Sequence, residues 1–136
     1  MKTITTYEAF DGKVFATEEE CRNHEKGVDK ALKEKVHIES ICINDHPYLY
    51  LFDEIENMDW YTFSPTCMGD IDAVIDYLMR EHPFCESVNN VEFVEGELYL
   101  ADYNGEDCSL HIMTWSHTKE VILADMNRFE ASRKNN

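Results

Sequence analysis

Basic residues are almost absent from the middle of this chain. Between Glu39 and Leu110, a window of 72 residues, there are 17 Asp or Glu residues and a single basic residue, Arg80. The formal net charge of the 136-residue chain is −16, and the residues outside this acidic window are balanced. A surface with one sign of charge repels the phosphates of DNA and RNA. The sequence therefore predicts a protein that does not bind nucleic acid directly.

Features of membrane proteins and of nucleotide-binding enzymes are also missing. No apolar run approaches the roughly 20 residues of a membrane span, and the polar start MKTITTYEAF is unlike a signal peptide. The five glycines are isolated turn residues, which leaves no glycine-rich phosphate loop. Five cysteines, an odd number without a secretory signal, indicate reduced thiols. We therefore expect a cytoplasmic protein without a membrane association.

The length and the 43% apolar content fit one domain over residues 1–136. Residues 1–36 are predicted to form a hairpin with its turn at Asp11-Gly12, followed by a helix that Thr17 caps and Glu20 supports. Residues 37–113 are predicted to form a strand group, a helix and a meander. Residues 116–132 are predicted to form a last helix, capped by Ser116 or Thr118.

Within residues 37–113, β-rich segments at 38–43, 48–52, 60–63, 91–94, 98–103 and 108–113 are predicted as strands. A helix is predicted from Asp70 to the residues before Pro83. Its apolar residues recur at helical spacing, as do three in the last helix: Ile71, Val74, Ile75, Leu78 and Met79, then Ile122, Met126 and Phe129. The pattern predicts an α+β fold, an antiparallel sheet packed by about three helices on one side.

Three Cys/His pairs share the same two-residue gap, which raises the question of a metal site. Zinc in structural sites takes four Cys or His ligands, usually supplied as two such pairs. Cys21 and His24 are three residues apart on a predicted helix and share a face, and His82 and Cys85 flank Pro83 at a helix end, so each pair can direct both side chains to one ion. The predicted zinc ligands are therefore Cys21, His24, His82 and Cys85. Cys108 and His111 would point to opposite faces of a strand. The alternative is that buried cysteines simply pack as small apolar residues.

An enzymatic activity has little support in the sequence. Cys67, in the segment SPTCMGD, precedes a helix N-terminus, where a thiolate would be stabilised. No histidine is placed beside it by the sequence, and a structural thiol explains it equally. Carboxylates are so abundant that a pair of them carries no information. We therefore expect that the protein is not an enzyme.

The exposed acids are the candidate contacts for a partner. One pair lies a helical turn apart on the outer face of the second predicted helix, and four more lie in the loop before Trp60: Asp72 and Asp76, then Asp53, Glu54, Glu56 and Asp59. Such a surface should attract a basic protein, for example one with a nucleic-acid-binding groove. Aromatic residues among the acids would add apolar anchors. The alternative is that the charge only keeps the protein in solution.

The opening segment TYEAFDGKVFATEEECRNHE resembles an N-terminal pattern of small phage and mobile-element proteins of Gram-positive bacteria. The matching positions are Tyr7, Asp11-Gly12, Phe15, Glu20-Cys21 and Glu25. Proteins of this kind include anti-CRISPR inhibitors of Cas9-type nucleases, some of which mimic DNA and a few of which bind metal. The resemblance covers about 20 residues and concerns the hairpin and helix more than an activity.

Charge and resemblance together lead to one hypothesis with an alternative. The chain is expected to be a phage-encoded inhibitor in the cytoplasm of a bacterial host cell. It would bind a basic defence protein, most concretely a Cas9-type nuclease, and block the loading of guide RNA or target DNA. The alternative is a zinc-binding structural or regulatory module of a mobile element. The oligomeric state is left open.

Overall fold

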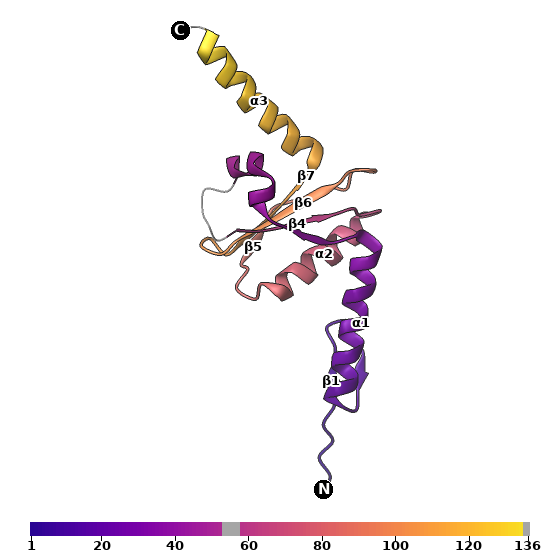
Figure 1. Ribbon diagram of the computed structural model, residues 1–136. Coiled ribbons are helices and arrows are strands. Elements are labelled where there is room, and N and C mark those ends of the chain that lie inside the picture. The colour runs from indigo at the N-terminus through magenta and orange to yellow at the C-terminus, as the bar shows by residue number, and fades with distance from the viewer. Residues whose placement is uncertain (53–57, 135–136) are drawn as a thin grey trace. The chain divides into compact units, whose positions relative to one another are not determined.

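A computed structural model describes residues 1–52 and 58–134, and the chain divides into two compact units, Met1–Lys35 and Val36–Asn136. The described residues contain three α-helices and seven strands, and the strands form two sheets (Figure 1). The predicted α+β class is therefore confirmed. The single domain over residues 1–136 stays a prediction, and each unit is described by itself.

The first unit contains a hairpin and most of a helix. Strands β1 (Tyr7–Glu8) and β2 (Val14–Phe15) pair antiparallel, and Gly12 in their turn has a φ of +88° that favours glycine. Helix α1 (Glu18–Val36) begins after Thr17, whose Oγ1 accepts a hydrogen bond from the Glu20 backbone N–H at 3.2 Å. Three glutamates in its first turn suit the positive end of the helix dipole. These local signals explain why the sequence predicts both elements.

The second unit is built on a five-stranded sheet in the order β3-β4-β6-β7-β5. Its strands, in chain order, are β3 (Glu39–Ile41), β4 (Met58–Phe63), β5 (Ser87–Val88), β6 (Tyr99–Asn104) and β7 (Ser109–Thr114). All pairings are antiparallel except that of β5 with β7, which is parallel. All six residues of the central strand β6 are buried. The predicted strand at 91–94 is wrong, and the short strand β5 was not predicted.

Helix α2 (Met68–Glu81) lies along one face of the sheet (Figure 1). Its buried side includes the predicted Ile71, Val74 and Leu78, while Met79 is exposed and Tyr77 is buried instead. At the start of the helix, the Asp70 carboxylate accepts hydrogen bonds from the backbone N–H and the hydroxyl of Thr66, at 2.9 and 2.8 Å. The helix ends just before Pro83, as predicted.

The opposite face of the sheet is covered by two short 3-10 helices, Ile43–Asp45 and Pro47–Leu51. Leu49 is buried against Trp60 of β4 and Leu100 of β6, with other apolar side chains around them: Ile41, Ile43, Phe52, Met113 and Trp115. The predicted strand at 48–52 is therefore wrong. The burial of Leu49 over the sheet outweighs the β-propensity of the aromatic residues beside it.

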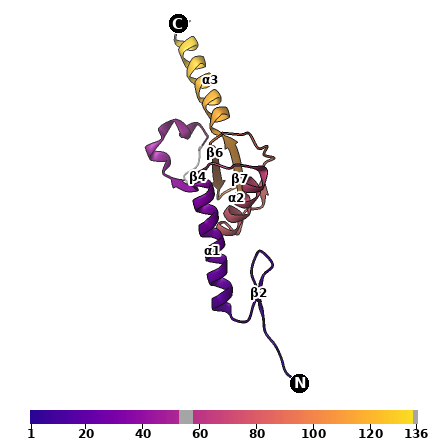
Figure 2. The same cartoon turned by 90° about the vertical axis from the view of Figure 1, so that its right-hand side faces the viewer.

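Helix α3 (Trp115–Lys134) follows β7 directly (Figure 2). Its cap is Thr114, whose Oγ1 accepts a hydrogen bond from the His117 N–H at 3.2 Å, so the predicted caps Ser116 and Thr118 are wrong. Thr118 is instead buried, and its hydroxyl donates to the Thr114 carbonyl at 2.9 Å. In the part of the chain that the structure describes, no helix is long and apolar enough to cross a membrane.

Candidate functional site

Exposed carboxylates gather at one end of the sheet in the second unit. There β4 begins, β6 turns into β7, and the segment after α2 returns to the sheet, since the Glu86 N–H donates to the Cys108 carbonyl at 2.7 Å. In the β6–β7 turn, Asn104 Oδ1 accepts the N–H groups of Glu106 and Asp107 at 2.9 and 3.3 Å. We call this region the acidic end, defined by five exposed residues: Asp59, Glu81, Glu86, Glu106 and Asp107.

His82 lies at the centre of the acidic end and joins α2 to the sheet. Its Nε2 is 2.7 Å from the Tyr61 hydroxyl, and its ring stacks on Tyr103 with the centroids 4.1 Å apart. Its Nδ1 is 3.9 Å from Asp59 Oδ2. The side chain of His82 is only 14% exposed, whereas that of Asp59 is 63% exposed. A packed aromatic cluster therefore supports carboxylates that face the solvent.

The two tyrosines of this cluster are neutral at physiological pH. Burial raises the pKa of Tyr61 to about 12, and the nearby charges of Asp59 and Glu81 add to the effect. Burial also raises the pKa of Tyr103, and its interactions with the Cys108 thiol act in the same direction. Neither phenol is therefore activated as a nucleophile. The negative charge of this end comes from its carboxylates, which suits binding of cationic groups.

An exposed phenylalanine lies in the turn that follows α2. The Cys85 N–H donates to the His82 carbonyl at 2.9 Å, and the Cys85 thiol donates to the Ser87 carbonyl at 3.4 Å. Phe84, inside this turn, is 77% exposed and lies in sequence between Glu81 and Glu86. Aromatic anchors surrounded by polar groups are typical of protein interfaces.

The predicted partner-binding residues fall into three groups. Asp59 belongs to the acidic end, near the C-terminal end of α2. Asp72 and Asp76 are exposed on α2 as predicted, and Asp76 Oδ2 accepts a hydrogen bond from Arg80 Nε at 3.2 Å, which offsets part of its charge. The remaining three predicted residues lie outside the described part of the chain: Asp53, Glu54 and Glu56.

Four residues of the acidic end were not predicted as contacts: Glu81, Glu86, Glu106 and Asp107. Glu106 and Asp107 fall in the segment expected to turn between two strands, which is a usable signal for exposure. The position of Glu86 depends on the pairing of β5 with β7, a two-residue contact that the sequence does not indicate.

The predicted zinc ligands are divided between the two units. In the first unit Cys21 is buried, which raises the pKa of its thiol, and His24 Nε2 is 2.6 Å from Asp11 Oδ2. In the second unit His82 and Cys85 belong to the turn after α2. Over residues 1–52 and 58–134, no three His, Cys, Asp or Glu side chains are placed to hold one ion. Zinc binding stays a prediction.

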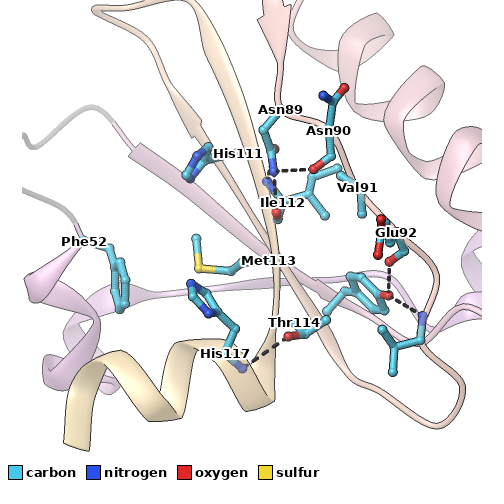
Figure 3. Close-up of a pocket in the computed structure, with 12 residues that line it drawn as sticks. Phe52, Asn89, Asn90, Val91, Glu92, His111, Ile112, Met113, Thr114 and His117 are labelled. Carbon is cyan, nitrogen blue, oxygen red and sulfur yellow. Dashed lines mark hydrogen bonds between the residues drawn. The ribbon is translucent and has the colours of Figure 1, made fainter. Parts of the chain in front are cut away.

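A cavity of about 390 Å³ lies beside β7, away from the predicted site residues. Figure 3 shows Phe52, Met113 and His117 on one side of the strand and Val91 and Glu92 on the other. The segment that forms its wall is fixed at two points. The Asn89 amide pairs with the backbone of Ile112 at 2.8 and 2.7 Å, and the Tyr99 hydroxyl donates to the Glu92 carbonyl at 2.6 Å. The volume suits a small molecule.

Comparisons with known proteins found no family model, no curated protein and no solved structure that matches the chain. The resemblance of the N-terminal segment to phage proteins stays a prediction.

Proposed function

We propose that the protein is an acidic inhibitor that binds the basic nucleic-acid-binding surface of another protein. The concrete partner that the N-terminal resemblance implies is a Cas9-type nuclease of a bacterial host, whose guide RNA or target DNA would then be excluded. The observation that carries the proposal is the acidic end, where five exposed carboxylates surround the packed His82 cluster.

Charge balance supports a partner of opposite sign. The acidic window has one basic residue, Arg80, and this residue interacts with Asp76. The carboxylates of the acidic end therefore keep a negative field that a groove built for phosphates would attract. Complementary charge of this kind raises the association rate and selects the partner more than it adds affinity.

The backbone of the acidic end is already fixed before a partner arrives. Asp59 lies in β4, and Glu106 and Asp107 lie in a turn that Asn104 closes. The backbone N–H of Glu86 donates to the carbonyl of Cys108, the residue before β7. A preorganised surface loses less conformational entropy on binding than a flexible acidic tail would. Phe84 adds an apolar contact beside these charges.

The test is an order-of-addition cleavage assay with a purified Cas9-type nuclease. The chain should block cleavage when it meets the guide-free nuclease first, and should have little effect on a complex already loaded with guide RNA and target DNA. A gel shift of the chain with DNA or RNA alone should show no complex at low ionic strength. Full cleavage in both orders, or tight binding of the chain to nucleic acid, would contradict the proposal.

A further inference from the structure

Helix α3 carries an apolar surface that no described residue of the second unit covers. Leu123, Met126 and Phe129 are 54%, 52% and 66% exposed, and they continue from the half-buried Ile122. At 3.6 residues per turn Ile122, Met126 and Phe129 form one stripe along the helix, and Leu123 lies about 100° around the helix from Ile122. We define Ile122, Met126 and Phe129 as the α3 stripe. Thr118 is the single buried residue among Trp115–Lys134, so the contact of α3 with the rest of the unit is confined to its first turns.

A helix in this situation lacks the packing that usually stabilises helices in proteins. Most helical stability in proteins comes from burying an apolar face, and α3 buries only Thr118. The ion pair between Arg128 and Asp125 at 3.4 Å is exposed to solvent and contributes little to the stability of the helix. Covering the α3 stripe would supply the missing stabilisation.

We infer that the α3 stripe is covered by the same stripe of a second copy of this chain, in an antiparallel pair of helices. Over residues 115–134 the charges nearly balance, with four basic and three acidic side chains. Two copies with a net charge of −16 each repel one another through their acidic windows, whereas α3 combines a nearly neutral charge with an exposed apolar stripe. A basic partner would be drawn to the acidic end instead.

The charges beside the α3 stripe fit the antiparallel direction. Lys119 and Glu130 are eleven residues apart, about three helical turns, so they lie on the same flank of the stripe. When Lys119 of one copy faces Glu130 of the other, twofold symmetry makes this ion pair twice. A parallel pair would instead bring Arg133 against Arg133 and would place Lys119 and Glu130 of the two copies on opposite sides of the contact.

The other flank of the stripe carries Asp125, which would face its symmetry mate near the centre of the pair. Its carboxylate is already paired with Arg128 on its own helix. The repulsion between the two aspartates is therefore reduced, while the two Lys119–Glu130 pairs remain attractive. The inference does not depend on the proposed function, because it concerns a different element and a different partner.

The experiment is sedimentation or light scattering of the full chain, from about 1 to about 100 µM, where modest interfaces associate. The wild type should reach twice the chain mass of 15.9 kDa. Phe129→Glu and Met126→Glu should each weaken association at least tenfold, because a charge enters the apolar contact. Val14→Glu, at an exposed apolar position outside α3, is the control and should not change it.

A charge exchange tests the direction of the pair while keeping the stripe intact. Lys119→Glu alone should weaken the dimer severalfold, and adding Glu130→Lys should restore it, with circular dichroism confirming that each variant is folded. A wild type that stays monomeric up to about 100 µM would overturn the inference and leave another molecule as the cover. Equal losses in Val14→Glu and Phe129→Glu would also overturn it. A double variant weaker than Lys119→Glu would overturn the antiparallel direction.

Discussion

At the scale of single residues, His82 is the side chain whose role differs most between sequence and structure. Its spacing to Cys85 predicts a metal ligand, whereas the folded chain places its Nε2 at the Tyr61 hydroxyl and its ring on Tyr103. Both tyrosines lie 21 residues away along the sequence. Spacing can indicate neighbours within a turn or a helix, but not partners that a sheet brings together.

Because of Tyr61, the stability of the folded protein should fall at alkaline pH. The phenol has a pKa of about 12 in the folded chain, against 10.0 for an unperturbed tyrosine. Its stabilising contribution is therefore complete below pH 10 and is lost as the pH rises toward 12, because the unfolded chain releases this proton first. Denaturant unfolding should show a steeper loss of stability over this interval in the wild type than in Tyr61→Phe.

Tyr48→Phe is the matched control for this measurement. It removes an exposed phenol and leaves Tyr61 in place, so the pH dependence of the wild type should be kept. Superimposable pH profiles of Tyr61→Phe and the wild type would show that Tyr61 has no raised pKa.

At the scale of elements, the predictable parts are those with local signals. The helices follow from apolar periodicity, and the hairpin and the first helix follow from Asp11-Gly12 and Thr17. The segment at 48–52 failed because alternating aromatic residues are typical of a strand, while the fold uses Leu49 to cover Trp60 and Leu100. That choice depends on Trp60 and Leu100, which are far from Leu49 in the sequence. The two-residue strand β5 carries no local signal at all.

The 3-10 helix Pro47–Leu51 should therefore contribute to stability through one side chain. Leu49 is 1% exposed and Leu51, two residues on, is 40% exposed. Leu49→Ala should lower the free energy of unfolding by about 2–5 kcal/mol, because it leaves a cavity against Trp60. Leu51→Ala should cost less than about 1 kcal/mol. Urea unfolding of the two variants measures both values.

A reversed order of these two losses, or equal losses, would mean that the segment does not cover the sheet through Leu49. In that case the strand predicted from the aromatic alternation would have to be reconsidered for residues 48–52.

At the scale of the whole molecule, charge is the property that the sequence predicts and the fold arranges. The acidic window is visible by counting, and Asp59, Asp72 and Asp76 are exposed as expected. The gathering of Glu81, Glu86, Glu106 and Asp107 beside Asp59 required the pairing of β4, β6 and β7 and the return of the chain after α2. The sequence shows how many acidic residues there are, and the topology of the sheet determines which of them lie close together.

A substitution at Phe84 tests the apolar part of the proposed contact independently of the charged part. Phe84→Ala should raise the dissociation rate from a guide-free Cas9-type nuclease about tenfold or more, while the association rate and its salt dependence change little. Biolayer interferometry gives both rates. An unchanged dissociation rate would leave the carboxylates as the sole contacts.

If the acidic end attracts a basic protein surface, the association rate should depend on its carboxylates. The change is the reversal of Glu81, Glu86 and Asp107 to Lys, measured with a guide-free Cas9-type nuclease over a series of salt concentrations. Reversing Asp72 and Asp76 gives a second comparison, with a smaller expected loss because Arg80 already offsets Asp76. The control reverses Glu8 and Glu34, two exposed acids of the first unit.

The triple reversal should slow association at least about tenfold at low salt, and its difference from the wild type should narrow as salt screens the charges. The control should stay within about twofold of the wild type, since its charges lie outside the acidic end. Equal slowing by the control and the triple reversal would show that total charge matters and not its position. Association of the triple variant at the wild-type rate and with the wild-type salt dependence would show that the acidic end does not attract the nuclease.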